Sequence, residues 1–374
     1  MKKTVLVLIV FWLVYLAWAS WGKEDLNPPS DTTFRIDDEF GHNTGKGNLV
    51  GIQPYMLPVD YANEKAFFQK MSGYFEEAKQ MGWLNDSSIV VLPEYLGTWL
   101  VATNEKTSIY AETQLGKALQ TMVLSNIFSF GKYYFTAPDS TKDKTKHAVF
   151  AMKAPQMAEI YQHTFSQLAK KHGVTIVAGS ILLPNPSVKA GQLVVGDGQL
   201  YNVTGVFSAD GSLVPTLVKK LFPVTEELPF VCPGKPEELP VFETPAGRLG
   251  VLVCADVWNS PAYRALKNKK AQFLAVPSYS MIDNVWLVPW GGYAGSPTPS
   301  EAKADVGKIT EGEAWRKYTM GRRAKSEAGI TKGMNVFLRG KLWDLGSDGR
   351  TLILNDSLMG AKGFAGPGIS CLWL

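Results

Sequence analysis

Short apolar runs alternate with helix-like patterns along most of this chain, and this alternation constrains the fold more than any other feature. From Asn48 onward, eight runs have the length and apolar content of buried strands: 49–54, 88–92, 175–182, 205–208, 215–221, 250–254, 273–276 and 335–339. Helical periodicity falls between several of them, at 63–81, 112–124, 154–172, 261–267 and 313–327. Strands and helices in this order predict an α/β layered domain.

The composition allows a large buried core and argues against several classes of protein. Of 374 residues, 45% are hydrophobic and 19% are charged, which suits one big domain or two small ones. The net charge of +4 is small and the basic residues are dispersed, so we expect no nucleic-acid partner. The four histidines and three cysteines lack the spacing of a metal site, and no dinucleotide fingerprint follows a strand. We therefore expect neither a metal nor a cofactor.

The N-terminal segment, residues 1–22, differs from the rest of the chain. Two lysines follow Met1, and an uncharged apolar stretch then runs through Trp21. Ala17 and Ala19 have the spacing of a signal-peptide cleavage site, whereas the length approaches the roughly 18 to 20 residues that span a bilayer. Trp18 and Trp21 suit a membrane interface and favour a retained anchor. With the lysines in the cytoplasm, the catalytic domain is expected on the extracytoplasmic side, or secreted after cleavage.

The remainder divides into a predicted tether and one large domain. Residues 23–47 are polar and rich in Pro, Asp and Gly, which is typical of a connecting segment. The domain then covers residues 48–374. Within it, segments 132–146 and 286–308 have the character of long loops, which either shape a binding site or form surface excursions.

Cys254 ends the apolar run 249–253 and begins a strand-to-helix turn. Free cysteine is among the most buried residue types, so the position alone suits a core thiol. A nucleophilic thiol needs activating neighbours, because the thiolate is the reactive species. The rest of the chain must therefore supply a base and a cation before Cys254 can be interpreted as a nucleophile.

Two other predicted strand ends carry groups of this kind. Glu94 directly follows the buried run 88–92 and Pro93, and the run 215–221 contains Lys219 and Lys220. Reactive groups of α/β sheets gather at the carboxyl ends of strands. Since consecutive strand residues face opposite sides, we expect only one of the two lysines to enter a shared site.

The order Glu94, lysine, Cys254 on three strand ends resembles the nitrilase (carbon-nitrogen hydrolase) superfamily. In that family a Pro-Glu pair closes an early strand, and a glycine turn precedes the catalytic lysine by eight residues, which from Gly211 selects Lys219. The resemblance runs from about residue 48 to the C-terminus, so 48–374 is expected to be a carbon-nitrogen hydrolase domain. It implies a four-layer-forming α-β-β-α sandwich, preceded here by one N-terminal hydrophobic helix, and a possible homodimer.

The resemblance also implies a second glutamate and a kind of substrate. The family's second glutamate lies about eight residues beyond the lysine; Glu227 fits this count, and Glu226 fits the neighbouring Pro223 better, so both stay candidates. Nitrile-cleaving members typically have Cys-Trp-Glu at the nucleophile. Here Ala255 and Asp256 follow the thiol, which favours an amide over a nitrile.

Elementary chemistry assigns a role to each group. Glu94 can take the thiol proton, pass it to the departing amine and later activate water. Lys219 can stabilise a tetrahedral oxyanion together with a backbone N–H after Cys254. Substrate contacts are expected from Ala255 and from Ser278 and Tyr279 at the end of another strand, which otherwise simply terminate it. Asp256 is interpreted as a cap of the following helix.

We therefore expect an enzyme that hydrolyses a non-peptide carbon-nitrogen bond of a small-molecule amide through a Cys254 thioester. One alternative uses the same residues for acyl transfer to an amine, because the apolipoprotein N-acyltransferase branch places this domain outside the cytoplasmic membrane. That branch carries several membrane helices, whereas this chain has at most one candidate. A second alternative is a catalytically silent protein that binds its ligand in the same fold.

Overall fold

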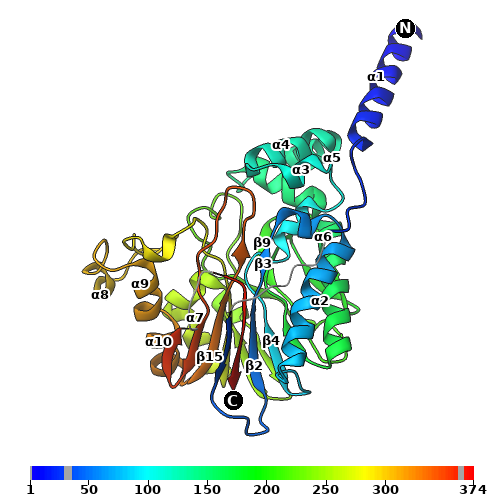
Figure 1. Ribbon diagram of the computed structural model, residues 1–374. Helices are drawn as coiled ribbons and strands as arrows, with labels where there is room; N and C mark the ends of the chain where they lie inside the picture. Colours follow the sequence, from blue (N-terminus) through cyan, green and yellow to red (C-terminus); the bar gives the residue numbers. More distant parts are fainter. Residues whose placement is uncertain (1, 29–35, 361–365) are drawn as a thin grey trace.

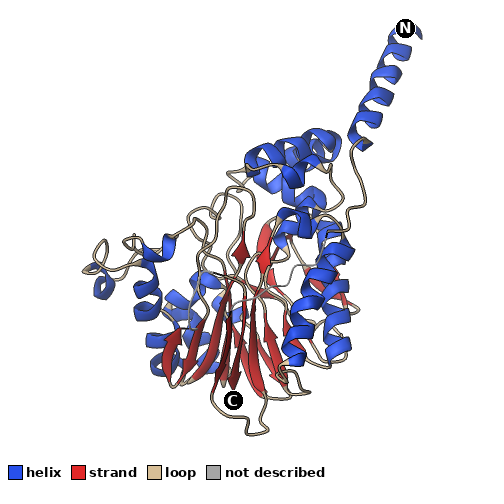
Figure 2. Cartoon of the chain, in the orientation of Figure 1, coloured by secondary structure: helices blue, strands red, loops and turns tan. Residues whose placement is uncertain are grey.

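The computed structural model describes residues 2–28, 36–360 and 366–374, and these form two six-stranded sheets packed between layers of helices (Figure 1, Figure 2). The first sheet consists, in spatial order, of β1 (Ile36–Phe40), β19 (Gly368–Trp373), β2 (Asn48–Gln53), β4 (Ser88–Val91), β5 (Thr175–Val177) and β10 (Val206–Phe207). The second consists of β12 (Val241–Thr244), β13 (Gly247–Val251), β14 (Phe273–Ser278), β15 (Lys332–Phe337), β17 (Leu352–Asn355) and β18 (Ser357–Gly360). The expected α-β-β-α sandwich is confirmed.

Helices cover the outer face of each sheet (Figure 1). The first sheet is covered by α2 (Glu64–Gln80) and α6 (Lys144–His172), and the second by α7 (Ser260–Asn268), α9 (Glu311–Tyr318) and α10 (Met320–Arg323). Three further helices lie at the end of the domain from which the N-terminal helix projects (Figure 1): α3 (Ser108–Ala111), α4 (Leu115–Ser125) and α5 (Ile127–Phe135). The short helix α8 is Ser300–Lys303.

Small sheets complete the structure around the sandwich. A three-stranded sheet contains β11 (Val218–Lys219), β9 (Leu200–Thr204) and β6 (Ile181–Pro184). Among the described residues, two strand pairs add β16 (Arg339–Gly340) with β3 (Tyr55–Met56), and β7 (Ser187–Lys189) with β8 (Gln192–Val194).

The central strands are apolar on both faces because each is covered twice, once by a helix and once by the facing sheet. The strands β2, β4 and β5 run parallel, as do β13, β14 and β15, which is typical of strands buried on both sides. The two sheets approach closely at Gly51, where a side chain would collide with Met334 and Val336 of β15. These strands deliver their carboxyl ends to one region, and β4, β13 and β14 all end there.

Several elements differ from the sequence-based expectation. Helix α6 begins ten residues earlier than predicted and continues through Pro155, because its buried face extends on both sides of the proline. The predicted strand 175–182 is two strands, β5 and β6, and the run 215–221 contributes only the two residues of β11. Helix α5 and the strands β17, β18 and β19 were not predicted.

The predicted tether, 23–47, is a connector only in part. Its residues Ile36–Phe40 form β1, which pairs in parallel with β19 at the edge of the first sheet. Residues 29–35 lie outside the described residues. The boundary at residue 48 therefore does not mark the start of the folded domain, and the correction follows from pairing with the C-terminal strand, which no local pattern reveals.

Helix α1 (Lys2–Ser20) projects away from the domain (Figure 1). Its segment Lys3–Ser20 has a mean hydropathy of 1.9 and is not enclosed by the rest of the described structure. This length and composition are shared by membrane spans and signal sequences.

Candidate active site

Cys254 lies on a constrained turn at the end of β13. After Val251 the chain leaves the sheet and enters a short 3-10 helix, Cys254–Trp258. Cys254 has φ of +49°, a left-handed conformation that residues with a side chain adopt rarely and that concentrates at functional sites. Its thiol is buried and donates to the carbonyl oxygen of Tyr279 at 3.7 Å. The turn thus presents the thiol to the carboxyl end of β14.

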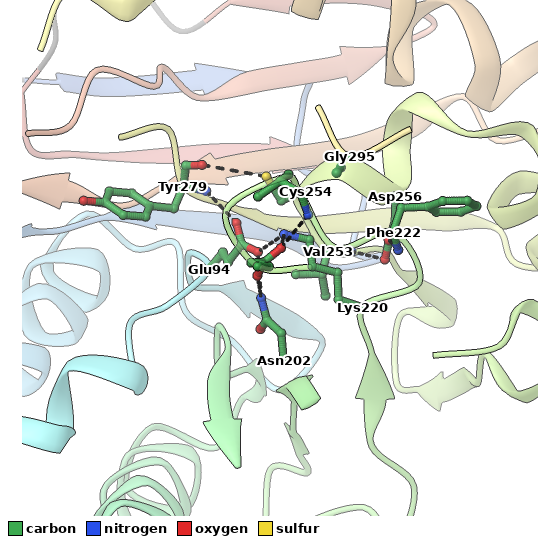
Figure 3. A network of polar contacts seen from close by, with 12 residues as sticks. Glu94, Asn202, Lys220, Phe222, Val253, Cys254, Asp256, Tyr279 and Gly295 are labelled. Carbon is green, nitrogen blue, oxygen red and sulfur yellow. Dashed lines mark hydrogen bonds and ion pairs between the residues drawn. The ribbon is translucent and has the colours of Figure 1, made fainter. Parts of the chain in front are cut away.

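Lys220 is the lysine that joins this region. Its ammonium Nζ lies 2.8 Å from Glu94 Oε1 and 2.6 Å from Glu227 Oε2, and all three side chains are almost completely buried. Figure 3 shows Glu94, Lys220 and Cys254 pointing toward a common centre from three separate segments. The structure therefore brings together the glutamate, lysine and cysteine that the sequence pattern predicts, with one change of lysine.

Lys219, the lysine selected by counting from Gly211, lies elsewhere. Its Nζ is 4.4 Å from the ring centre of Tyr201, on the face of β11 opposite to the cluster. Alternation along β11 admits one lysine to the site, as expected, but only Val218 and Lys219 pair as a strand. The connection from the turn is irregular, so a residue count could not fix which lysine faces inward.

The structure also separates the two candidate glutamates. Glu227 is buried, and its carboxylate accepts hydrogen bonds from the Tyr95 hydroxyl and from the Val224 N–H at 2.8 Å. Glu226 is exposed and borders the cavities beside Cys254. Glu227 is therefore the second carboxylate of the cluster.

Burial and charge set the protonation states. Burial, together with the charge of Glu227, raises the pKa of Glu94 against the opposing effect of Lys220. Burial also opposes ionisation of Glu227, but the ammonium and hydrogen bonds of Lys220 outweigh it and lower the pKa of Glu227. The pKa of Lys220 is raised well above its usual value because the two carboxylates overcome its burial. The cluster thus contains a cationic Lys220, an anionic Glu227 and a Glu94 carboxyl that is protonated more readily than an ordinary glutamate.

The thiol belongs to the same electrostatic system. Burial, and next the negative charge of Glu94, raise the pKa of Cys254 well above its usual value, while Lys220 acts in the opposite direction. The resting group is therefore a thiol. It becomes a nucleophile only when a base removes its proton during attack, and Glu94 is the carboxylate placed to do so.

Three groups orient the carboxylates, and of their residues the sequence singled out only Tyr279, as a substrate contact. Asn202 Nδ2 on β9 donates to Glu94 Oε1 at 2.9 Å and to Glu227 Oε1 at 3.0 Å, so one amide holds both acids. The Tyr279 N–H donates to Glu94 Oε2 at 3.1 Å, and the Tyr95 hydroxyl binds Glu227. Asn202 is a polar side chain in a buried strand, a sequence signal that becomes informative only when that strand is recognised.

Asp256 does more than cap a helix. Its Oδ1 accepts from the N–H groups of Leu221 and Phe222, each at 2.9 Å, and its Oδ2 accepts from Val253 N–H at 3.0 Å (Figure 3). These bonds join the residues after Lys220 to the residue before Cys254. Burial raises the pKa of Asp256 to about 7. The expectation of a cap therefore understates a residue that fixes the lysine segment against the thiol turn.

Within the described residues, two cavities meet at Cys254. The first, of about 320 Å³, is almost wholly apolar, and its wall includes Trp99, Leu115, Leu119, Phe150 and Phe230. The second, of about 430 Å³, is more polar, and its wall includes Ala255, Asn259, Tyr293, Ser296 and Glu311. Both also contact Tyr279 and Met281. A molecule bound across the thiol could therefore place chemically different ends in different cavities.

The remaining predicted contacts divide between these cavities and the core. Tyr279 and Ala255 border the second cavity, and their contact with substrate stays a prediction. Ser278 is fully buried, its hydroxyl has no hydrogen-bond partner among the described residues, and it lines neither cavity. The predicted loop 286–308 supplies part of the second cavity wall, whereas 132–146 contributes only Lys146, to the first.

The chain is similar to several known proteins. The family model described as carbon-nitrogen hydrolase matches residues 49–291. The omega-amidase NIT2 of Danio rerio is 33% identical over 120 residues, which is 30% of this chain and 39% of that protein. The probable hydrolase YhcX of Bacillus subtilis is 22% identical over 153 residues, 41% of this chain and 27% of that protein. The matches thus span less than half the length of either curated relative.

Similar solved structures include an amidase from Nesterenkonia sp., with a TM-score of 0.49 and 14% identity, covering 87% of this chain and 88% of that one. Another is Nit3 of Saccharomyces cerevisiae, a member of branch 10 of the nitrilase superfamily, with a TM-score of 0.48 and 15% identity, covering 86% of this chain and 88% of that one.

Proposed function

Because this chain belongs to the carbon-nitrogen hydrolase family, as the match over residues 49–291 shows, we propose that it hydrolyses a non-peptide amide through a thioester on Cys254. The observation that carries the proposal is the buried contact of the Lys220 ammonium with Glu94 and Glu227 beside a protonated thiol. Such a cluster is costly to bury unless its charges are paired, and its position at the ends of β4, β11 and β13 matches that of reactive groups in α/β folds.

The first half of the reaction forms the thioester. Glu94 takes the thiol proton as Sγ of Cys254 attacks the amide carbon, and the carbonyl oxygen gains the negative charge. The Lys220 ammonium and a backbone N–H of the turn after Cys254 stabilise this oxyanion. Glu94 then gives its proton to the nitrogen, the C–N bond breaks, and the amine leaves.

The second half releases the acid. Glu94 takes a proton from water, whose oxygen attacks the thioester carbon, and the collapsing intermediate expels the Cys254 sulfur, which recovers the proton. The products are a carboxylic acid and an amine, and the enzyme returns to its starting state. The raised pKa of Glu94 suits a group that must accept and donate a proton in the same cycle. Glu227 acts as a positioning residue that keeps Lys220 charged and in place.

An amide, rather than a nitrile, is the substrate class that the site favours. Ala255 and Asp256 follow the thiol, and Asp256 is fully used in hydrogen bonds to backbone N–H groups. The curated relative from Danio rerio, named an omega-amidase, supports the same class.

The experiment is amide turnover by paired variants. Cys254→Ser and Glu94→Gln are expected to abolish acid release. The control substitutions Cys232→Ser and Glu237→Gln, at residues that border neither cavity, should leave it nearly unchanged. Glu94→Gln should slow the modification of Cys254 by iodoacetamide and leave that of Cys232 unchanged. Equal activity in all variants would show that the cluster has a structural role alone.

Acyl transfer is the second candidate, and the meeting of two cavities at one thiol favours it. The apolar cavity suits an acyl chain, and the polar cavity provides a separate space for an amine acceptor. Supplying a donor with and without amines distinguishes the reactions: free acid as the main product in both cases indicates hydrolysis, and N-acyl product indicates transfer.

We also propose that α1 anchors the domain on the extracytoplasmic side of a membrane. Its apolar length and the lysines that follow Met1 support this orientation. The mass of the mature N-terminus tests it, since cleavage after Ala19 would remove the anchor.

A further inference from the structure

Helix α5 presents an unusual surface. All nine of its residues are described. Six of them are aromatic or aliphatic, yet none of the nine is buried. The side chains of Phe128 and Phe135 are 58% and 84% exposed, and Leu124 and Ile127 beside them are also exposed. We call these four residues the hairpin face. Contiguous exposed apolar residues of this kind are typical of an interaction surface.

Helix α1 is attached to this face by specific contacts. The Tyr15 hydroxyl donates to the Leu124 carbonyl oxygen at 3.2 Å and accepts from Ile127 N–H at 3.2 Å, at the junction of α4 and α5. The rings of Trp12 and Phe128 are 4.6 Å apart. The apolar surface of α1 is therefore continuous with the hairpin face.

The buried side chain of Lys106 binds the C-terminal end of α1. Lys106 Nζ donates to the carbonyl oxygens of Trp18 and Trp21, the latter at 2.5 Å, and lies 4.5 Å from the ring centre of Trp18. A cation bound to the last carbonyl groups stabilises the C-terminal end of a helix. The domain thus contacts α1 at its C-terminal turn and along one side from Trp12 onward.

These contacts place the hairpin face at a definite depth. Trp12 precedes the end of α1 at Ser20 by eight residues, which is roughly 12 Å along a helix. If the apolar part of α1 crosses a bilayer, the side chains that contact Trp12 and Tyr15 lie below the level at which α1 emerges. Residues 115–137 carry lysines at 117 and 132 and no acidic residue, which suits anionic headgroups.

The helix pair α4 and α5, which carries the hairpin face, also reaches the catalytic cavity. Leu115 and Leu119 of α4 line the apolar cavity that contacts Cys254, while Leu124 at the other end of α4 belongs to the hairpin face. One helix therefore extends from the proposed bilayer surface to the acyl side of the site.

We propose that the hairpin face docks in the interface of a lipid bilayer, and that the substrate is an amphiphilic amide whose apolar chain passes from the bilayer into the cavity lined by Leu115 and Leu119. The substrate part of this inference rests on the proposed amide chemistry, whereas the docking part does not. Docking beside α4 shortens the path of the chain to Cys254, and the polar amine end remains in the second cavity.

Docking is tested with the full-length protein in vesicles of phosphatidylcholine and phosphatidylglycerol that contain spin-labelled lipid. Phe135→Cys carries an environment-sensitive fluorophore in a Cys232→Ser, Cys254→Ser background, and Leu287→Cys, 60% exposed on another surface, is the matched control. We expect quenching by shallow spin labels at residue 135 and none at 287. An unquenched label at 135 overturns docking, and a blue-shifted but unquenched label identifies a second protein copy as the occupant.

The substrate class is tested by activity. The double variant Phe128→Ser, Phe135→Ser should lose about tenfold in turnover of dodecanamide presented in vesicles, because two interfacial aromatic anchors are removed, yet cleave soluble acetamide normally. Leu287→Ser should change neither rate. If the unmodified protein cleaves acetamide at least as fast as dodecanamide, the long-chain substrate is refuted. If it cleaves neither amide, the proposed amide chemistry fails, and the quenching experiment still decides docking.

Discussion

Exchanging each of the adjacent lysines for methionine separates the role of the buried cluster from that of its neighbour. Lys220→Met keeps the side-chain volume and removes the charge that lies 2.8 Å from Glu94 and 2.6 Å from Glu227. Removal of an oxyanion donor costs about 100- to 1,000-fold in kcat. Lys219→Met removes only a contact with the Tyr201 ring, so its activity should remain within about twofold of the parent.

The same pair predicts a difference in stability. Breaking a buried ion pair by removing one partner costs about 3–5 kcal/mol, whereas loss of a half-exposed cation–π contact costs about 0.5–1 kcal/mol. Without Lys220, both carboxylates are buried beside each other and their pKa values rise above those of the unfolded chain. A raised carboxyl pKa gives stability at low pH that is lost as pH rises through the folded value, so the defect should be larger at pH 8 than at pH 5.

The assays are amide turnover, with kcat and KM measured separately, and urea unfolding at both pH values. Lys220→Arg is an additional probe, because it restores charge without the geometry of a single ammonium. The reasoning is refuted if Lys219→Met abolishes turnover while Lys220→Met keeps it, or if Lys220→Met is no less stable than Lys219→Met at pH 8.

Four further predictions rest on the same contacts. Glu227→Gln should reduce kcat about tenfold or more through displacement of the lysine, with Glu237→Gln, at an exposed glutamate that borders neither cavity, as the unaffected control; steady-state kinetics of both variants checks this. Since Glu94 must be ionised to act as a base and its pKa is raised, kcat/KM should fall with decreasing pH at a value above that of an ordinary glutamate; a flat profile down to pH 4 would contradict this assignment. Asp256→Asn should lower the free energy of unfolding by about 1–3 kcal/mol, because at least one buried N–H loses its acceptor, and a denaturant titration that shows no change would exclude this role. Alkylation of Cys254 should accelerate with pH up to a value above that of a free thiol, because its pKa is raised; a rate that is already maximal at pH 7 would indicate a preformed thiolate.

The sequence predicts the layers of the fold because buried strands and amphipathic helices leave local patterns. It does not predict β1 and β19, whose pairing joins segments more than 300 residues apart. Nor does it place the start of α6, since Pro155 is usually disfavoured inside a helix, and here burial on both sides outweighs that local preference.

The site was predictable to the extent that its residues close recognisable strands. Glu94 and Cys254 follow long apolar runs, so their positions could be read directly. Lys220 follows a strand of only two residues, and the choice between it and Lys219 depends on an irregular connection. Asn202 makes contacts across the fold to carboxylates 108 and 25 residues away, and no spacing rule predicts such contacts.

The most direct test of the central claim is mass spectrometry of the protein quenched during turnover of an amide. The account predicts an increase equal to the acyl group on the peptide that contains Cys254, removed by hydroxylamine and absent in Cys254→Ser. An acyl group on another residue, or unchanged turnover by Cys254→Ser, would contradict it.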